Sequence, residues 1–136
     1  MGLFTGKRPA NLGVRSGKLA PPKFTPNCVS SQADAGDRVH YIEPLRFSGP
    51  PARAWAALKA AVREMERARI VTEEAGYLYA ECTSRLMRYV DDVEFYLDEK
   101  AGVIHVRSAS RLGRTDFGVN RERIEAIRAR MASTSV

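Results

Sequence analysis

Two runs of the sequence decide the predicted fold, and they read Asp91-Asp92-Val93-Glu94-Phe95 and Arg107-Ser108-Ala109-Ser110-Arg111. Both runs lie in segments with the composition of strands. The first carries three carboxylates, and the second carries two guanidinium groups and two hydroxyls. A small sheet does not need this much charge to stay in solution, so we expect these two strands to mark the functional region.

The two strands are predicted to form an antiparallel hairpin. They flank residues 98–102, a polar stretch of the length that joins paired strands. Pairing Phe95 with Val106 buries the apolar side chains of both strands together, because alternate side chains of a strand share a face. This register places Glu94 directly opposite Arg107.

The charged hairpin is expected to hold a structural polar network, whose members are Asp91, Asp92, Glu94, Arg107 and Asp116. Asp91 falls on the apolar face of its strand, so it requires a partner of its own. An exposed cross-strand ion pair contributes only about 0.2–1 kcal/mol. Removing one partner of a buried pair destabilises a protein by about 3–5 kcal/mol. The network therefore matters most if another segment covers it.

The remaining elements complete an α+β fold. Composition and apolar alternation predict strands at 39–47, 70–74, 77–84, 89–97 and 103–110. Helical spacing predicts one helix capped by Ser48 and a second capped by Asn120. The order β-α-β-β-β-β-α predicts an antiparallel sheet of about five strands with two helices on one face. We expect an extended arm at 1–37, a single domain at 38–132 and a disordered tail at 133–136.

The end of the second charged strand and the start of the last helix form a candidate anion site. Hydroxyls, guanidinium groups and the backbone N–H groups at a helix start favour phosphate or carboxylate ligands. The expected ligand-binding residues are Ser108, Ser110, Arg111, Asn120 and Arg121. In the alternative interpretation, Asn120 only caps the helix and the arginines pair with the carboxylates of the network. The sequence leaves both open.

The net charge of +6 comes mostly from the N-terminal segment. Residues 1–23 hold five basic side chains and no acidic one, whereas residues 24–136 hold 17 basic and 16 acidic ones. Nucleic-acid binding usually requires a basic face on the folded domain, so we expect the basic tail to be a solvated arm. The sequence contains no run of eighteen apolar residues, so it predicts no membrane span. We expect a soluble, cytoplasmic protein.

The cysteines and histidines predict neither a disulfide framework nor a metal site. Cys82 lies in an apolar strand pattern that is typical of a small buried side chain. Cys28 follows an irregular segment, and we expect it to be the more accessible thiol. His40 and His105 have no second ligand close by in the sequence, so we expect no metal and no cofactor.

These features favour a non-catalytic binding or accessory module whose ligand is a small anion or a segment of a protein partner. One alternative is an enzyme that uses Asp91, Asp92 or Glu94 as an acid or base. A strongly raised carboxylate pKa in a cleft would favour this alternative. The other alternative is weak nucleic-acid binding through the basic arm. No residue is assigned a catalytic role, because no nucleophile with a clear partner accompanies the carboxylates.

Four motifs in a fixed order resemble the family called domain of unknown function 1499. They are residues 26–32 (PNCVSSQ), 91–95 (DDVEF), 107–113 (RSASRLG) and 116–121 (DFGVNR), and the resemblance covers about residues 20–131. The resemblance assigns no activity, but it implies that these motifs form one unit. It therefore implies that residues 26–32 pack over the charged face. This adds four residues to the polar network: Asn27, Cys28, Ser30 and Ser31.

Overall fold

The computed structural model describes residues 6–85 and 88–134. Its elements are, in chain order, β1 (Cys28–Ser30), β2 (Leu45–Arg46), α1 (Pro51–Arg63), β3 (Ala68–Glu74), β4 (Tyr77–Thr83), β5 (Val90–Asp98), β6 (Val103–Ser110) and α2 (Val119–Thr134). Two helices and an antiparallel sheet confirm the predicted α+β class. Within these residues, neither helix combines the length and the apolar character that crossing a membrane requires.

The sheet has six strands rather than about five, in the order β1-β6-β5-β4-β3, with β2 also paired to β6. The additional strand is β1, which comes from the segment expected to be irregular and pairs with residues 107–109. The strand expected at 39–47 is reduced to β2. β2 starts directly after Pro44, which has no N–H group to donate to a neighbouring strand. β1 and β2 both pair with β6, so they complete the sheet beside the charged hairpin.

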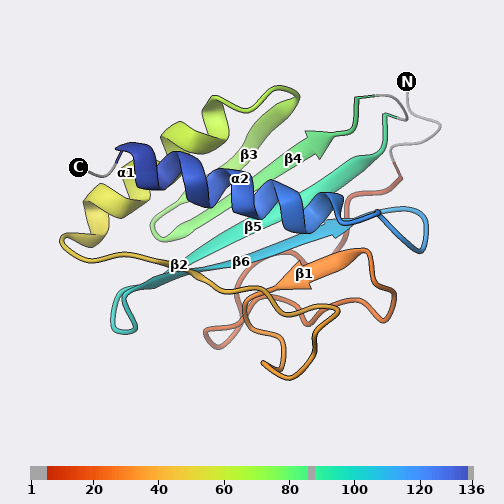
Figure 1. Ribbon diagram of the computed structural model, residues 1–136, viewed down its shortest axis with the longest axis horizontal. Helices are drawn as coiled ribbons and strands as arrows, with labels where there is room; N and C mark the ends of the chain where they lie inside the picture. Colours follow the sequence, from red (N-terminus) through yellow and green to blue (C-terminus); the bar gives the residue numbers. More distant parts are fainter. Residues whose placement is uncertain (1–5, 86–87, 135–136) are drawn as a thin grey trace.

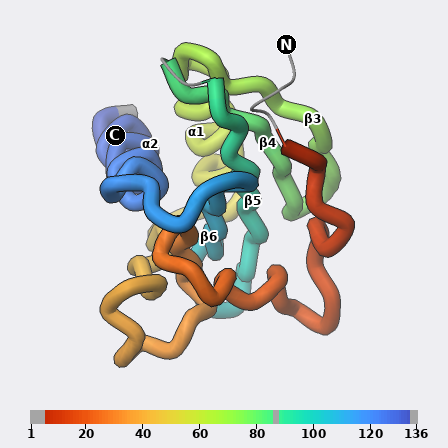
Figure 2. The backbone as a smooth tube through the Cα atoms, turned by 90° about the vertical axis from the view of Figure 1, so that its right-hand side faces the viewer, coloured from red at the N-terminus to blue at the C-terminus, as the bar shows by residue number. Residues whose placement is uncertain are grey.

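The molecule has three layers. Figure 1 shows both helices on one face of the sheet, as predicted. Figure 2 shows the N-terminal segment running along the opposite face. We call residues 6–24 the arm, the face under the helices the helix side, and the face under the arm the arm side.

The helix side holds the hydrophobic core. Leu58 and Val62 of α1 and Ile124 and Ile127 of α2 are buried, at the positions that the helical spacing predicted. They belong to one cluster with Phe95 of β5. The apolar stripes of both helices therefore anchor them to the same face of the sheet.

The predicted register of the charged hairpin is confirmed. Phe95 pairs with Val106, and Glu94 pairs with Arg107. Because side chains alternate along a strand, Glu94 lies on the arm side, whereas Asp91 lies on the helix side. The carboxylates of β5 are thus divided between two different environments.

Both predicted helix caps are wrong. α1 is preceded by Pro50, and no side chain of the described part of the chain caps it, so Ser48 does not have this role. Asn120 lies inside α2, where its backbone N–H donates to Asp116 Oδ2 at 3.0 Å. The Asp116 carboxylate also accepts the Gly118 N–H at 2.9 Å and so satisfies donors at the helix start.

The arm is not a solvated tail, contrary to expectation. Leu19 is buried, its N–H donates to Gln32 Oε1 at 2.8 Å, and Gln32 Nε2 donates to Gly17 O at 3.0 Å. The expectation that residues 26–32 cover the charged face is also wrong, because β1 extends the sheet at its edge. The segment that covers the charged face is the preceding one, the arm.

Candidate binding face

The arm side gathers polar side chains from three neighbouring strands. We define the binding face as Tyr77, Tyr79 and Glu81 of β4, Asp92 and Glu94 of β5, Arg107 of β6, and Arg111 directly after β6. The strand registers bring these residues together, because Glu81 pairs with Asp92 and Tyr79 pairs with Glu94. Most of these side chains are buried, so the arm and the sheet enclose a polar layer.

Arg111 is at the centre of one half of this face. Its guanidinium binds both oxygens of Asp92, at 2.9 and 2.8 Å, and Glu81 Oε2 at 2.7 Å. The Tyr79 hydroxyl donates to Asp92 Oδ1 at 2.5 Å. The bond to Asp92 raises the pKa of Arg111 further above its usual range. Two parallel hydrogen bonds from a guanidinium to one carboxylate form a strong, bidentate contact, so the Arg111 side chain is held in place by Asp92.

Glu81 links this cluster to the arm. Arg8 lies 2.6 Å from Glu81 Oε2 and stacks over the Tyr79 ring at 5.8 Å from its centre. Burial alone would raise the pKa of Glu81, but hydrogen bonds from Arg8, Arg111 and Tyr79 lower it to about 2. Glu81 is therefore a permanently charged acceptor for a basic side chain of the arm.

Glu94 forms the other half of the face. It is 1% exposed, and its Oε2 accepts the Gly13 backbone N–H at 2.7 Å and the Tyr77 hydroxyl at 2.6 Å. Its Oε1 has no hydrogen-bond partner within the described part of the chain. Burial raises the pKa of Glu94, although Gly13, Tyr77 and nearby Arg107 act in the opposite direction. A buried, partly satisfied carboxylate is costly, which is typical of a functional position.

Arg107 lies opposite Glu94 but does not neutralise it. Of the described residues, no acidic side chain forms an ion pair with Arg107. Its guanidinium instead donates to the backbone carbonyl of Pro21, at 3.1 and 3.3 Å. Both members of this cross-strand pair therefore bind the backbone of the arm.

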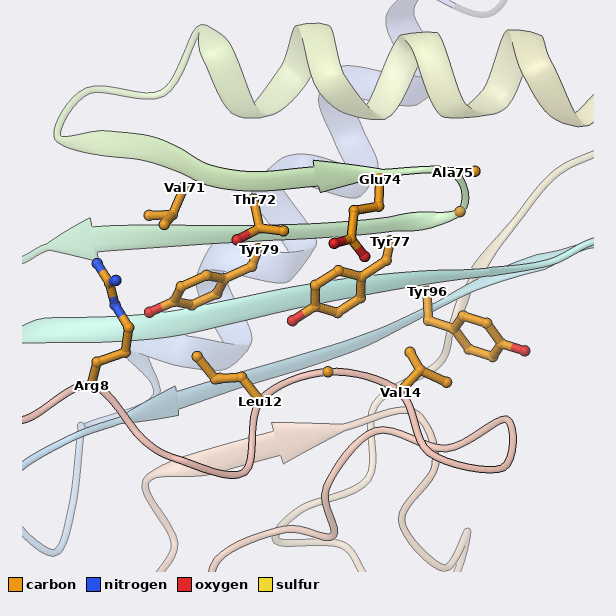
Figure 3. A pocket seen from close by; sticks show the side chains of 12 residues that line it. Arg8, Leu12, Val14, Val71, Thr72, Glu74, Ala75, Tyr77, Tyr79 and Tyr96 are labelled. Carbon is orange, nitrogen blue, oxygen red and sulfur yellow. The ribbon is translucent and has the colours of Figure 1, made fainter.

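A cavity of about 470 Å³ remains between the arm and the sheet. Figure 3 shows the rings of Tyr77 and Tyr79 extending from β4 toward Leu12, with Arg8 at one end and Tyr96 at the other. Burial and the neighbouring carboxylates raise the pKa of both Tyr77 and Tyr79, so their hydroxyls remain donors. The arm thus covers the binding face without filling it.

The helix side contains a second, separate polar cluster. Arg123 of α2 pairs with Asp91 at 2.8 Å, which supplies the partner that Asp91 was expected to need. The Asn120 amide group donates to Ser110 Oγ at 2.9 Å and accepts from the Ser108 hydroxyl at 2.5 Å. Asn120 Nδ2 also donates to Asp116 at 2.7 Å. This cluster is closed by its own hydrogen bonds.

The structure divides the expected anion-binding set between these two clusters. Ser108, Ser110 and Asn120 lie together on the helix side, whereas Arg111 binds Asp92 on the arm side. Arg121 donates to the Val39 carbonyl at 3.2 Å, away from both. The helix start, which was expected to attract an anion, already receives the Asp116 carboxylate. Anion binding by this set stays a prediction.

The four residues added by the family resemblance lie along the edge of the sheet. The Asn27 amide donates to the Gly113 carbonyl at 2.8 Å, and Ser30 Oγ accepts the Gln32 N–H at 3.1 Å. Ser31 Oγ lies 3.0 Å from His105 Nδ1. Cys28 is fully buried, so the expectation of an accessible thiol is wrong. Burial raises the pKa of Cys28.

Sequence reasoning missed Tyr77, Tyr79, Glu81 and Arg8 on the arm side. The pairing of Arg123 with Asp91 on the helix side agrees with the alternative interpretation, in which the arginines pair with the carboxylates. A signal for the three missed residues of β4 was present, because β4 alternates polar and apolar residues as Tyr77-Leu78-Tyr79-Ala80-Glu81. Pairing that alternation with β5 would have placed the three polar side chains beside Asp92 and Glu94. Nothing in the sequence indicated that Arg8 contacts Glu81, because 73 positions of the chain separate the two residues.

The family model described as "Protein of unknown function (DUF1499)" matches residues 18–131. The chain belongs to the DUF1499 family. Every residue of the binding face lies inside the DUF1499 match, whereas residues 6–17 of the arm, with Arg8 and Gly13, lie outside it. No curated protein matches the chain significantly. The DUF1499 unit therefore carries the binding face, and a segment outside the match covers part of it.

Proposed function

We propose that the protein is a ligand-binding module that receives an extended, basic protein segment on the arm side of its sheet. In this proposal, residues 6–17 of its own chain occupy the site. The observation that carries the proposal is the environment of Glu94. This buried carboxylate takes a backbone N–H from Gly13, although the guanidinium of Arg107 is its cross-strand neighbour.

Backbone groups of the arm supply part of the recognition. Gly13 donates its N–H to Glu94, and the Gly6 carbonyl accepts from Arg111 at 3.3 Å. The carbonyl at position 6 is a group that any segment offers, whereas the N–H of Gly13 is presented at a φ of 102°, which favours glycine at this position. Further selection comes from Arg8, which reaches the permanently charged Glu81. The preferred segment therefore carries a basic residue at this position.

The position of the family boundary supports exchange of the arm segment. Residues 15–18 form a tight turn, with paired hydrogen bonds between Arg15 and Lys18 of 2.8 and 3.1 Å. Gln32 holds the chain on both sides of position 18, and Arg107 holds Pro21. The chain after the turn is thus anchored to the DUF1499 unit. Residues 6–17 are the part that a second segment of similar chemistry replaces.

The cavity adds a further preference. Leu12 and Val14 line it together with three tyrosines, and about 470 Å³ remains unfilled. Burying apolar surface stabilises a complex by roughly 25 cal/mol per Å². A guest segment with an aromatic side chain at the position of Leu12 therefore binds more tightly than the arm itself.

A peptide of residues 6–17 with a fluorescent label tests the proposal on the full-length protein. The tethered arm competes at an effective concentration in the millimolar range, so the wild-type protein binds this peptide weakly. Gly13→Pro removes the donated N–H and cannot adopt the φ of 102° found at this position. We expect Gly13→Pro to bind the peptide at least tenfold more tightly than the wild type, as measured by fluorescence anisotropy.

A peptide with N-methylglycine at position 13 is the matched control, because it lacks only the N–H that Glu94 accepts. We expect it to bind Gly13→Pro at least fivefold more weakly than the unmodified peptide. Equal affinities for the two peptides, or no binding to a folded Gly13→Pro protein, would contradict the proposal.

Acid–base chemistry at Glu94 is a second candidate function. Two features favour it: the raised pKa of Glu94, and its Oε1 atom, which has no hydrogen-bond partner among the described residues, next to the cavity-lining Tyr77. A panel of ester, amide and phosphate-ester substrates tests it with Gly13→Pro. Turnover that Glu94→Gln abolishes would establish this function. For either function, we propose the cytoplasmic location that was expected from the sequence.

A further inference from the structure

A second cavity lies on the helix side, far from the arm in the layered structure, where β2 meets the start of α1 and the end of α2. Its volume is about 480 Å³, within the range of small-molecule sites. Its walls come from the segment 45–49, from the first two turns of α1 and from the last two turns of α2. Two parts of the chain that are distant in sequence, residues 45–57 and 128–132, thus build one concave site.

The inner wall of this cavity is apolar. Leu45, Ala54 and Met131 are buried members of the hydrophobic core, and Phe47 packs against the same core. These side chains offer no hydrogen-bond partner to water. An apolar wall of this kind favours a hydrocarbon group over solvent.

All charged side chains that line the cavity are basic among the described residues, namely Arg46, Arg53 and Arg128. Arg128 is fixed by the carbonyls of Glu43 and Pro44, both at 2.8 Å. Arg46 pairs with the Glu43 side chain at 3.1 Å, and both of these side chains are more than half exposed. Such an exposed pair contributes at most about 1 kcal/mol and exchanges readily.

Arg53 is the decisive group. Across residues 6–85 and 88–134, no hydrogen bond or ion pair engages the Arg53 side chain. It lies in the first turn of α1, a turn without an acidic residue. A guanidinium with open donors at the mouth of an apolar cavity matches a carboxylate or phosphate that carries an apolar chain.

We propose that this cavity binds an anionic amphiphile, with the acid group at Arg53 and Arg46 and the alkyl chain against Leu45, Phe47 and Met131. Charge complementarity and the apolar wall together select this occupant. Neither a simple anion nor a neutral hydrocarbon satisfies both parts of the site. The site is independent of the arm, because none of its lining residues belongs to the binding face.

Calorimetry with the full-length protein tests the proposal, with decanoate kept below its micelle-forming concentration. Decanol lacks the charge, and acetate lacks the chain. We expect decanoate to bind at least tenfold more tightly than decanol, and acetate to give no binding heat. Amide NMR signals of Ala54 and Ala57 should shift with decanoate. Similar binding of decanoate and decanol, or shifts confined to other segments, would overturn the proposal.

Two variants and one control identify the site. Arg53→Gln, which changes an exposed side chain, should weaken decanoate binding about fivefold or more. Ala57→Phe should abolish binding by filling the cavity. Arg38→Gln, an exposed arginine that does not line the cavity, should leave binding unchanged. Unchanged affinity in Arg53→Gln would overturn the proposal.

Anionic phospholipid vesicles are the last ligand to be tested, because a membrane lipid combines an acid group with an alkyl chain, as a free fatty acid does. Binding of monomeric decanoate supports an enclosed site for single molecules. Binding to vesicles without binding of monomeric decanoate would overturn the cavity proposal and indicate surface association instead.

Discussion

Glu94 and Arg107 are cross-strand partners that do not neutralise each other: Glu94 accepts the Gly13 N–H, and Arg107 donates to the Pro21 carbonyl. If the two residues served stability alone, a direct ion pair would satisfy both. Instead each side chain forms a hydrogen bond with a backbone group of the arm. This arrangement is the basis for placing the ligand-binding function on the arm side.

Glu94 should make stability fall as the pH rises. Its pKa is raised, so the folded state holds a proton that the unfolded chain releases above the ordinary carboxyl pKa. The contribution is complete below the ordinary pKa and is lost as the pH rises through the raised pKa, by up to about 1.4 kcal/mol per pH unit.

Glu94→Gln should remove this pH dependence. We expect the variant to equal or exceed the wild type in stability at pH 8, with no such advantage at pH 4, in urea unfolding at both pH values. A variant that is less stable than the wild type at both pH values would show that the carboxylate is mainly structural.

Glu81 should act in the opposite direction. Hydrogen bonds lower its pKa to about 2, so its stabilising contribution is present above the ordinary carboxyl pKa. That contribution should disappear as the pH falls from about 4.5 toward 2. Glu81→Gln should therefore lower the melting temperature at pH 7 and much less at pH 2.5. An equal loss at both pH values would contradict the assigned charge state.

Arg107 should anchor the base of the arm. Arg107→Met removes both donors to the Pro21 carbonyl, so the arm should loosen while the helix side stays folded. We expect trypsin to cut after Arg15 and Lys18 several times faster in the variant. Arg38→Met is the control. If Arg107→Met is cleaved no faster than this control, Arg107 does not anchor the arm.

Arg123 should support the fold and not the binding face. Arg123→Met leaves Asp91 buried and unpaired, which should lower the free energy of unfolding by about 3–5 kcal/mol. Replacing Asp91 with Asn in the same protein should recover part of the loss. Peptide binding on the arm side should be unaffected in the folded fraction. A loss of this binding would contradict the claim that Arg123 acts only on the fold.

The sequence predicted the α+β class, both helical stripes and the register of the charged hairpin, because each depends on local periodicity. Pairing Phe95 with Val106 was enough to place Glu94 opposite Arg107. The helix caps were wrong because Asp116 accepts the N–H groups that Asn120 was expected to serve. Asp116 and Asn120 are both residue types that cap helices, and the composition of this segment does not indicate which of the two accepts the N–H groups at the helix start.

The candidate site was located only in part. Asp92, Glu94, Arg107 and Arg111 do lie on one face, but Ser110 lies on the other, since neighbouring residues of a strand point in opposite directions. The expected anion set combined residues from both faces. The role of Arg8 followed from no local pattern, because the arm reaches the sheet through contacts between distant parts of the chain.

The most direct test of the central claim is the position of a bound segment on the protein. A peptide of residues 6–17 with a spin label in place of Leu12 should broaden the NMR signals of Tyr77, Tyr79 and Tyr96 in the Gly13→Pro protein. Signals of the α2 helix should remain sharp. Broadening centred on α2, or spread evenly over the surface, would contradict a binding site on the arm side of the sheet.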